Sequence, residues 1–230
     1  MALFGRKKQQ QPVEAEPSEA VPAEPPVRGP RDRADVPDPD GRLDLGALWL
    51  RGVPGMQLRL EADQERQKVI GAHLVLPDAQ VQVQVFAAPK STGIWDEIRD
   101  EIAQSLATGG GTAEETEGPY GTELQVRMPT RDAAGQTVFS PARFVGIDGP
   151  RWFFRAVMSG RAAIDDAVAE KFYALLDDMV VVRGDVPMAP REVLALSLPR
   201  KPQGEDGADV DTEADALDPF RRGPEITEIR

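Results

Sequence analysis

The sequence predicts an α+β fold, in which two β-β-β-α pseudo-repeats form one mostly antiparallel sheet with both helices on one face. Two observations predict this architecture. Segments whose apolar and polar residues alternate, as in half-buried strands, are followed by a segment whose apolar residues recur every four positions, as on one face of a helix. This order of three strands and one helix occurs over residues 56–108 and again over residues 124–178.

The first unit consists of three predicted strands and one predicted helix. The strands are residues 56–60, 70–76 and 81–85, which alternate in polarity or carry an apolar stripe. The helix is predicted from apolar residues four positions apart, which are Ile94, Ile98, Ile102 and Leu106. The glycines at 109–111 end this helix and predict a flexible linker. A phosphate-binding loop is not expected here, because the glycines follow a helix and an acidic stretch lies at 114–117.

The second unit repeats the residue types of the first. Leu124–Met128 matches Met56–Leu60 in polarity, but the third strand, residues 152–157, fits only with a one-residue gap that brings its apolar phase into line. A second helix is predicted from Ile164, Val168, Phe172 and Leu176, and a last strand from residues 179–182. Because neither unit can bury a sheet face alone, we expect one shared core. A chance match of alternating patterns is the alternative.

The predicted domain covers residues 43–200 and lies between two segments expected to be disordered. Residues 1–42 hold a basic start and an acidic, proline-rich linker, and residues 201–230 form an acidic tail. Their few apolar residues cannot offset the entropy lost on ordering. The net charge is −12 for the chain, −2 for residues 1–40 and −5 for residues 201–230, so the domain itself is only mildly acidic.

Composition excludes several classes of site. The chain has no cysteine and one histidine, which excludes disulfides, thiolate metal sites and sites built from several histidines. We predict no metal site and no cofactor. A nucleic-acid partner is not expected, because the chain is acidic. No apolar stretch is long enough to cross a membrane, and the basic start is not followed by the apolar segment of a signal peptide, so a cytoplasmic location is expected.

Residues that could carry acid–base chemistry have simpler explanations. His73 could act as a general base, but it lies within a predicted strand and is explained as a polar residue on a sheet face. The adjacent acids Asp96 and Glu97, and Asp165 and Asp166, lie where the first turn of a helix favours negative charge. Asp177 and Asp178 end the second helix, where acids are unfavourable. We therefore predict no catalytic residue.

Arginines on the predicted strands form the candidate ligand site. By strand phase, Arg59, Arg127 and Arg143 point away from the apolar stripes, and Arg155 belongs to the same group of strand arginines. If the helices cover the other face, these three arginines build a locally basic sheet surface that could bind an anionic ligand or an acidic segment. A plain solvated sheet face is the alternative.

Several longer strings resemble one known family. They are MALFGRKK at the start, LDLGALWLRGVPGMQLRLE, GPYGTELQVRMP, GPRWFFRAVMSGRAA and MAPREVLALSLP. Together, over most of residues 1–200, they resemble an actinobacterial family of uncharacterised proteins, a domain of unknown function often encoded near deoxyuridine triphosphatase genes. The resemblance implies a bacterial cytosolic protein and transfers no catalytic residue.

Two hypotheses for function follow. The first is a non-enzymatic protein-interaction or regulatory protein that binds another protein through the sheet face or the terminal segments. The second is a binder of a small anionic, nucleotide-like ligand, or an enzyme acting on one, with an arginine-lined pocket at the seam of the two units. The oligomeric state and the ligand are not predicted.

Overall fold

The structure is a computed structural model that describes residues 28–199. The predicted basic start, most of the predicted linker and the predicted acidic tail lie outside these residues. Residues 28–42 belong to the folded domain, because β1 (Arg31–Asp32) and the 3-10 helix η1 (Arg33–Asp35) precede the predicted boundary at residue 43. The backbone N–H of Arg31 donates to the carbonyl of Met179 at 2.9 Å, which ties this segment to the end of the domain.

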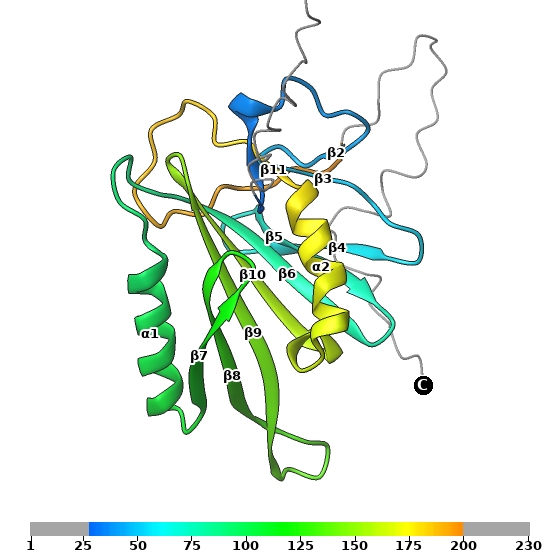
Figure 1. Ribbon diagram of the computed structural model, residues 1–230, viewed down its shortest axis with the longest axis vertical. Coiled ribbons are helices and arrows are strands. Elements are labelled where there is room, and N and C mark those ends of the chain that lie inside the picture. The colour runs from blue at the N-terminus through cyan, green and yellow to red at the C-terminus, as the bar shows by residue number, and fades with distance from the viewer. Residues whose placement is uncertain (1–27, 200–230) are drawn as a thin grey trace, which may run out of the picture.

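A seven-stranded antiparallel sheet forms the body of the protein (Figure 1). Its strands, in the order in which they lie across the sheet, are β4 (Gln57–Asp63), β5 (Lys68–Leu76), β6 (Ala79–Ala87), β10 (Trp152–Gly160), β9 (Thr137–Gly149), β8 (Gly121–Arg131) and β7 (Thr112–Gly118). The predicted α+β class with a mostly antiparallel sheet is confirmed. The strand order, with β6 beside β10 at the centre, is consistent with two β-β-β-α units but does not establish the repeat.

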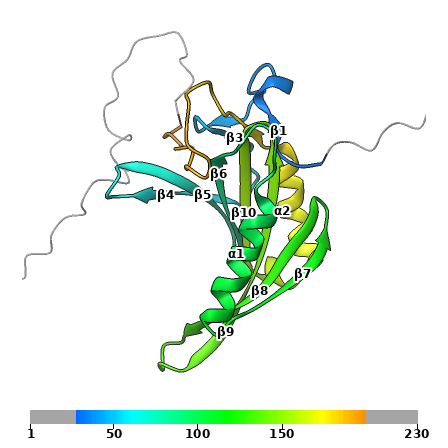
Figure 2. The ribbon, with the colours of Figure 1, turned by 90° about the vertical axis from the view of Figure 1, so that its left-hand side faces the viewer.

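The two helices, α1 (Trp95–Thr108) and α2 (Asp166–Asp178), lie on opposite faces of the sheet. Phe153 and Phe154 are neighbours in β10 and therefore point to opposite faces. The ring of Phe153 stacks on Trp95 of α1, with 5.9 Å between centroids, whereas Phe154 packs in the core cluster that contains Phe172 of α2. Figure 1 shows α2 in front of β6 and β10, and Figure 2, turned by 90°, shows α1 in front of the sheet. The prediction of both helices on one face is wrong.

The reason is that the apolar side chains change faces across the sheet. Along one row of paired residues on the α1 face, the first three side chains are polar and the next three apolar: Arg59, His73, Gln82, Val157, Phe144 and Leu124. The adjacent row on the α2 face has the reverse order: Leu58, Leu74, Val81, Met158, Arg143, Gln125 and Glu114. Each half of the sheet thus has its apolar side chains on a different face. A different part of the chain must cover each of these apolar faces.

The α2 face of the first half is covered by α2 and by a second, smaller sheet. This sheet contains, in spatial order, β1, β11 (Val180–Val181), β3 (Leu48–Leu50) and β2 (Leu43–Asp44). Leu48 and Leu50 of β3 belong to the same buried cluster as Leu74 and Val81 of the large sheet. The main core therefore lies between the two sheets and α2.

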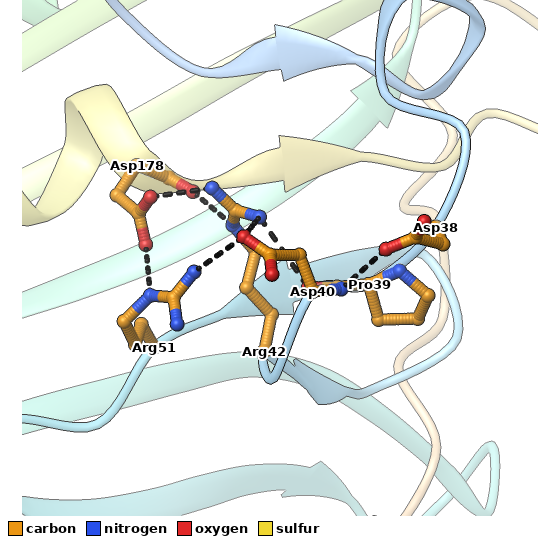
Figure 3. Close-up of polar contacts among 6 residues, drawn as sticks. All are labelled: Asp38, Pro39, Asp40, Arg42, Arg51 and Asp178. Carbon is orange, nitrogen blue, oxygen red and sulfur yellow. Dashed lines mark hydrogen bonds and ion pairs between the residues drawn. The ribbon is translucent and has the colours of Figure 1, made fainter.

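Two acids at the end of α2 anchor the N-terminal segment, and Figure 3 shows the contacts of one of them, Asp178. Arg42, whose side chain is 5% exposed, donates to the backbone carbonyl of Asp178 at 2.7 Å and pairs with its carboxylate. Arg51 donates to the other carboxylate oxygen of Asp178 at 3.1 Å. The carboxylate of Asp177 accepts the backbone N–H of Gly29 at 2.7 Å. These contacts compensate two negative charges that the helix dipole disfavours at this position.

Two segments differ in detail from the prediction. The stretch after the predicted glycine linker, for which no element is predicted, forms β7, which pairs with β8 at the edge of the large sheet. Its glutamates face solvent, so the strand lacks the apolar alternation by which buried strands are predicted. Ile164, assigned to the stripe of the second helix, precedes the N-cap residue Asp165 and is 71% exposed. Asp165 caps this helix by accepting the backbone N–H groups of Ala167 and Val168.

Candidate functional site

The structure brings together two of the three predicted site arginines. Arg127 and Arg143 lie on the α2 face, on β8 and β9, and line one cavity. Arg59 lies on the α1 face of β4, is exposed, and donates to Gln57 of the same strand at 2.9 Å. The change of faces across the sheet separates them, because the same residue pattern points in opposite directions in the two halves. A ligand held by all three arginines is incompatible with this geometry.

Arg143 is buried and forms part of a polar network. Its guanidinium donates to Asp166 at 2.7 Å and to the hydroxyl of Tyr173 at 3.1 Å. Tyr173 in turn donates to the buried carboxylate of Glu123 at 2.6 Å. Burial raises the pKa of Glu123, although the hydrogen bond from Tyr173 and the charge of Arg143 act in the opposite direction. The network fixes Arg143 at the base of the cavity between α2 and the sheet.

The cavity beside this network is polar, has a volume of about 370 Å³, and contains both signs of charge. Its lining includes Arg127 and Arg143 and also the acids Glu114 and Asp166. The two carboxylates offset the two guanidinium groups, so the cavity is not a strongly positive site of the kind that selects phosphate. Binding of an anionic ligand by Arg127 and Arg143 stays a prediction.

A long hairpin extends the same face beyond the cavity. Strand β7 pairs with β8 only as far as Arg127, and β10 pairs with β9 only as far as Ala142, so residues 129–140 pair only with each other. Figure 2 shows this end of β8 and β9 extending away from the rest of the sheet. A turn closes the hairpin, in which the carboxylate of Asp132 accepts the N–H groups of Ala134 and Gln136.

The hairpin carries an exposed aromatic side chain between arginines. Phe139 is 55% exposed and pairs with Pro129, on the face that also presents Arg127, Arg131 and Pro141. We call these five residues the hairpin surface. Neither arginine has a carboxylate partner among residues 28–199. No element is predicted here from the sequence. Asp132 and Gly135, which favour a turn, are the signal that indicates the hairpin.

The remaining candidates take structural roles. His73 is partly buried on the α1 face, with its Nε2 3.4 Å from a carboxylate oxygen of Glu61. Asp96 pairs with Arg99 one turn later in α1, at 2.6 Å. Within residues 28–199, no group of three or more acidic or histidine side chains could hold a metal ion. None of the helices described is long and apolar enough to cross a membrane.

Comparison with known proteins places the chain in a family. Residues 29–205 match the family described as "Protein of unknown function (DUF3710)", and the chain belongs to this family. The match begins next to the first described residue, and so includes the N-terminal segment that Asp177 and Asp178 anchor. No curated protein matches the chain. Function is therefore inferred from the geometry of the site alone.

Proposed function

We propose that this protein is a non-enzymatic interaction protein that uses the hairpin surface to bind a partner protein with acidic groups around an apolar patch. The observation that carries the proposal is the exposure of Phe139 between Arg127 and Arg131 on a hairpin that extends beyond the sheet. Aromatic and arginine side chains are the residue types most enriched where protein interfaces have their largest binding energies.

The construction of the hairpin supports this proposal. A two-stranded hairpin without further cover is marginally stable in water, and an exposed Phe adds nothing to its stability. Here the turn is held by Asp132, and Thr130 Oγ1 lies 3.1 Å from the hydroxyl of Ser140 on the opposite strand. These contacts keep Phe139 on a defined face and reduce the entropy that a partner must remove on binding.

The charge of the surface supports the choice of partner. The chain carries a net charge of −12, yet Arg127 and Arg131 are exposed and have no carboxylate partner among the residues described. An acidic partner would be attracted to this part of the protein and repelled by most of the rest, which favours one orientation of approach. Ile164, exposed at the rim of the cavity next to Pro141 and Arg143, extends the apolar part of the surface toward α2.

The test compares Phe139 with its neighbour Val138. Val138 is 41% exposed on the opposite face of the same hairpin, so Val138→Ser is a matched control for Phe139→Ser. A photo-reactive phenylalanine analogue at position 139 is used to capture the partner in cells, and the purified partner is then titrated against each variant. We expect Phe139→Ser to weaken binding at least about tenfold and Val138→Ser less than about twofold.

Salt dependence provides a second criterion. If Arg127 and Arg131 attract acidic groups, affinity should fall as ionic strength rises, and this dependence should be smaller for Arg131→Gln. Equal affinities for the Phe139 and Val138 variants, or no captured protein that binds when purified, would contradict the proposal. The cytoplasmic location expected from the sequence is part of this proposal. So are the actinobacterial origin and the gene neighbourhood that the sequence resemblance implies.

A further inference from the structure

An apolar cavity lies on the α1 face, on the side of the sheet opposite the hairpin surface. It has a volume of about 380 Å³ and is bounded by α1 and by strands β6, β9 and β10. The sheet contributes three aromatic rings and one cation: Phe86, Phe144, Phe153 and Arg155. Helix α1 contributes mainly aliphatic side chains, among them Ile98, Ile102 and Leu106. We call this cavity the α1 groove.

Arg155 is the unusual member of this lining. It lies at the centre of the sheet, where β10 pairs with β6, and its guanidinium lies over the ring of Phe86 at 5.3 Å from the centroid. Its one hydrogen bond to a side chain among the residues described goes to the neutral amide of Gln84, and its Nε is buried without a partner. Desolvation by burial lowers the pKa of Arg155.

Other shielded arginines of this protein have a carboxylate partner. The side chains of Arg42, Arg99 and Arg143 are 5%, 12% and 7% exposed, and each forms an ion pair with an aspartate or glutamate. Arg155 has no carboxylate within 4.0 Å among residues 28–199. A cation shielded from water normally needs such a partner, because desolvation of an unpaired charge is costly.

The acids nearest to the groove are already engaged. Glu61 acts on Arg155 only as a charge at a distance; its carboxylate accepts from Gln82 and lies 3.4 Å from His73. Glu101, which lines the groove, pairs with Arg191 at 2.9 Å. Arg191 links the segment after β11 to α1 and bounds the groove on that side. The charge of Arg155 is therefore available to an anion that enters the groove.

We propose that the α1 groove binds a small carboxylate with an apolar body, whose carboxylate pairs with Arg155 and whose body lies on the phenylalanine rings. The volume is within the range of small-molecule sites, and a mostly apolar lining with a few charged groups is their usual composition. Glu101 and Arg191 neutralise each other in an ion pair, which leaves Arg155 as the charge available to a ligand. A monoanion suits the site better than a phosphate dianion, because Arg155 supplies one positive charge and the remaining uncompensated charge would lie against apolar side chains. We assign a small molecule as the ligand, because the ion pairs of Arg191 with Glu97 and Glu101 close one side of the groove and limit its length.

The experiment is calorimetric titration of the full chain with octanoate, and with octan-1-ol as the neutral analogue. We expect one octanoate per chain and affinity at least about tenfold weaker for octan-1-ol, since a hydrogen-bonded charge pair is lost. Arg155→Met should weaken octanoate about tenfold or more without changing octan-1-ol. Arg59→Met is the matched control, an arginine of the same sheet face outside the groove, and should leave both affinities unchanged.

A second variant separates binding from folding. Ile102→Trp adds volume inside the groove and should abolish octanoate binding in a chain whose thermal unfolding is still cooperative. Equal affinity for octanoate and octan-1-ol, or octanoate binding unchanged by Arg155→Met, would overturn the proposal. Absence of octanoate binding would overturn it too, and binding of an acidic, leucine-rich decapeptide in its place would identify the groove as a peptide site.

Discussion

The two halves of the large sheet bury their apolar side chains on opposite faces. In the half made of β4, β5 and β6, the apolar side chains face α2 and the smaller sheet, and the polar residues Arg59, His73 and Gln82 face the other way. In the half made of β8 and β9, a cluster of apolar side chains that includes Leu124, Val126 and Ala142 faces α1. Arg143 and Gln125 lie on the α2 face. A similar alternation of residues therefore leaves two polar regions, one on each face.

This difference determines where ligands can bind. Each helix covers the apolar part of one face, and the boundary between its covered and open parts is where a cavity forms. On the α2 face the cavity is polar and continues into the hairpin surface. On the α1 face it is mostly apolar and contains Arg155, which has no carboxylate partner within residues 28–199. The two proposed sites are thus chemically different and should act independently.

The largest expected effect on stability comes from β10, the central strand of the large sheet, which packs against α2 on one face and against α1 on the other. Phe153 and Phe154 are both fully buried, one against each helix. We expect Phe154→Ala and Phe153→Ala each to reduce the free energy of unfolding by about 3–5 kcal/mol, since each leaves a large cavity. Denaturant titration measures this. A loss below about 1 kcal/mol for either variant would show that its face is not packed as described.

An intermediate effect distinguishes the two shielded arginines. Arg143 has two side-chain partners, Asp166 and Tyr173, so Arg143→Met should cost about 1–2 kcal/mol of stability. Among the described residues, Gln84 is the one side-chain hydrogen-bond partner of Arg155, so removing the desolvated charge of Arg155 should leave stability unchanged or raise it by about 1 kcal/mol. Thermal and denaturant unfolding measure the stability of both variants. Equal losses of stability would contradict the difference in pairing between Arg143 on the α2 face and Arg155 on the α1 face.

The smallest effect concerns pH and the buried Glu123. Its folded-state pKa is raised, chiefly by burial, above the unfolded value of about 4.3. The stability that Glu123 contributes is therefore complete below about pH 4 and is lost as pH rises through the folded-state pKa. Glu123→Gln, which keeps an acceptor for Tyr173, should remove this loss, so that its advantage over wild type is greater at pH 7 than at pH 4. If the unfolding midpoints of Glu123→Gln and wild type changed with pH in the same way, Glu123 would not be the group responsible for the loss of stability.

Much of the fold could be predicted because its strands and helices are strongly periodic. The stripe at Ile94, Ile98 and Ile102 predicts α1, and the alternation at Val81–Val85 predicts β6. The face of the sheet on which each helix packs could not be predicted in this way. Alternation shows that a strand has one apolar and one polar face, but it does not show which helix covers the apolar face. The signal in the sequence is the one-residue gap needed to align the third strands of the two units. A shift of one residue moves the apolar side chains of a strand to the other face of the sheet.

The candidate sites were only partly predictable. The arginines could be recognised by type and strand phase, and Arg127 and Arg143 do line one cavity. Arg59 could not be separated from them, because its face depends on pairing between distant segments. The hairpin surface was missed because residues 129–140 lack a buried stripe. The importance of Arg155 depends on its having no carboxylate partner in the part of the chain that the structure describes, which only three-dimensional packing reveals.

Hydrogen exchange of Phe153→Ala and Phe154→Ala, each compared with wild type, tests the division of the sheet most directly. Phe153 contacts α1 and Phe154 packs with α2, although the two residues are adjacent in sequence. The account predicts that Phe153→Ala increases exchange mainly in residues 95–108 and that Phe154→Ala does so mainly in residues 166–178. Increased exchange in the same helix for both variants would contradict the opposite placement of the two helices.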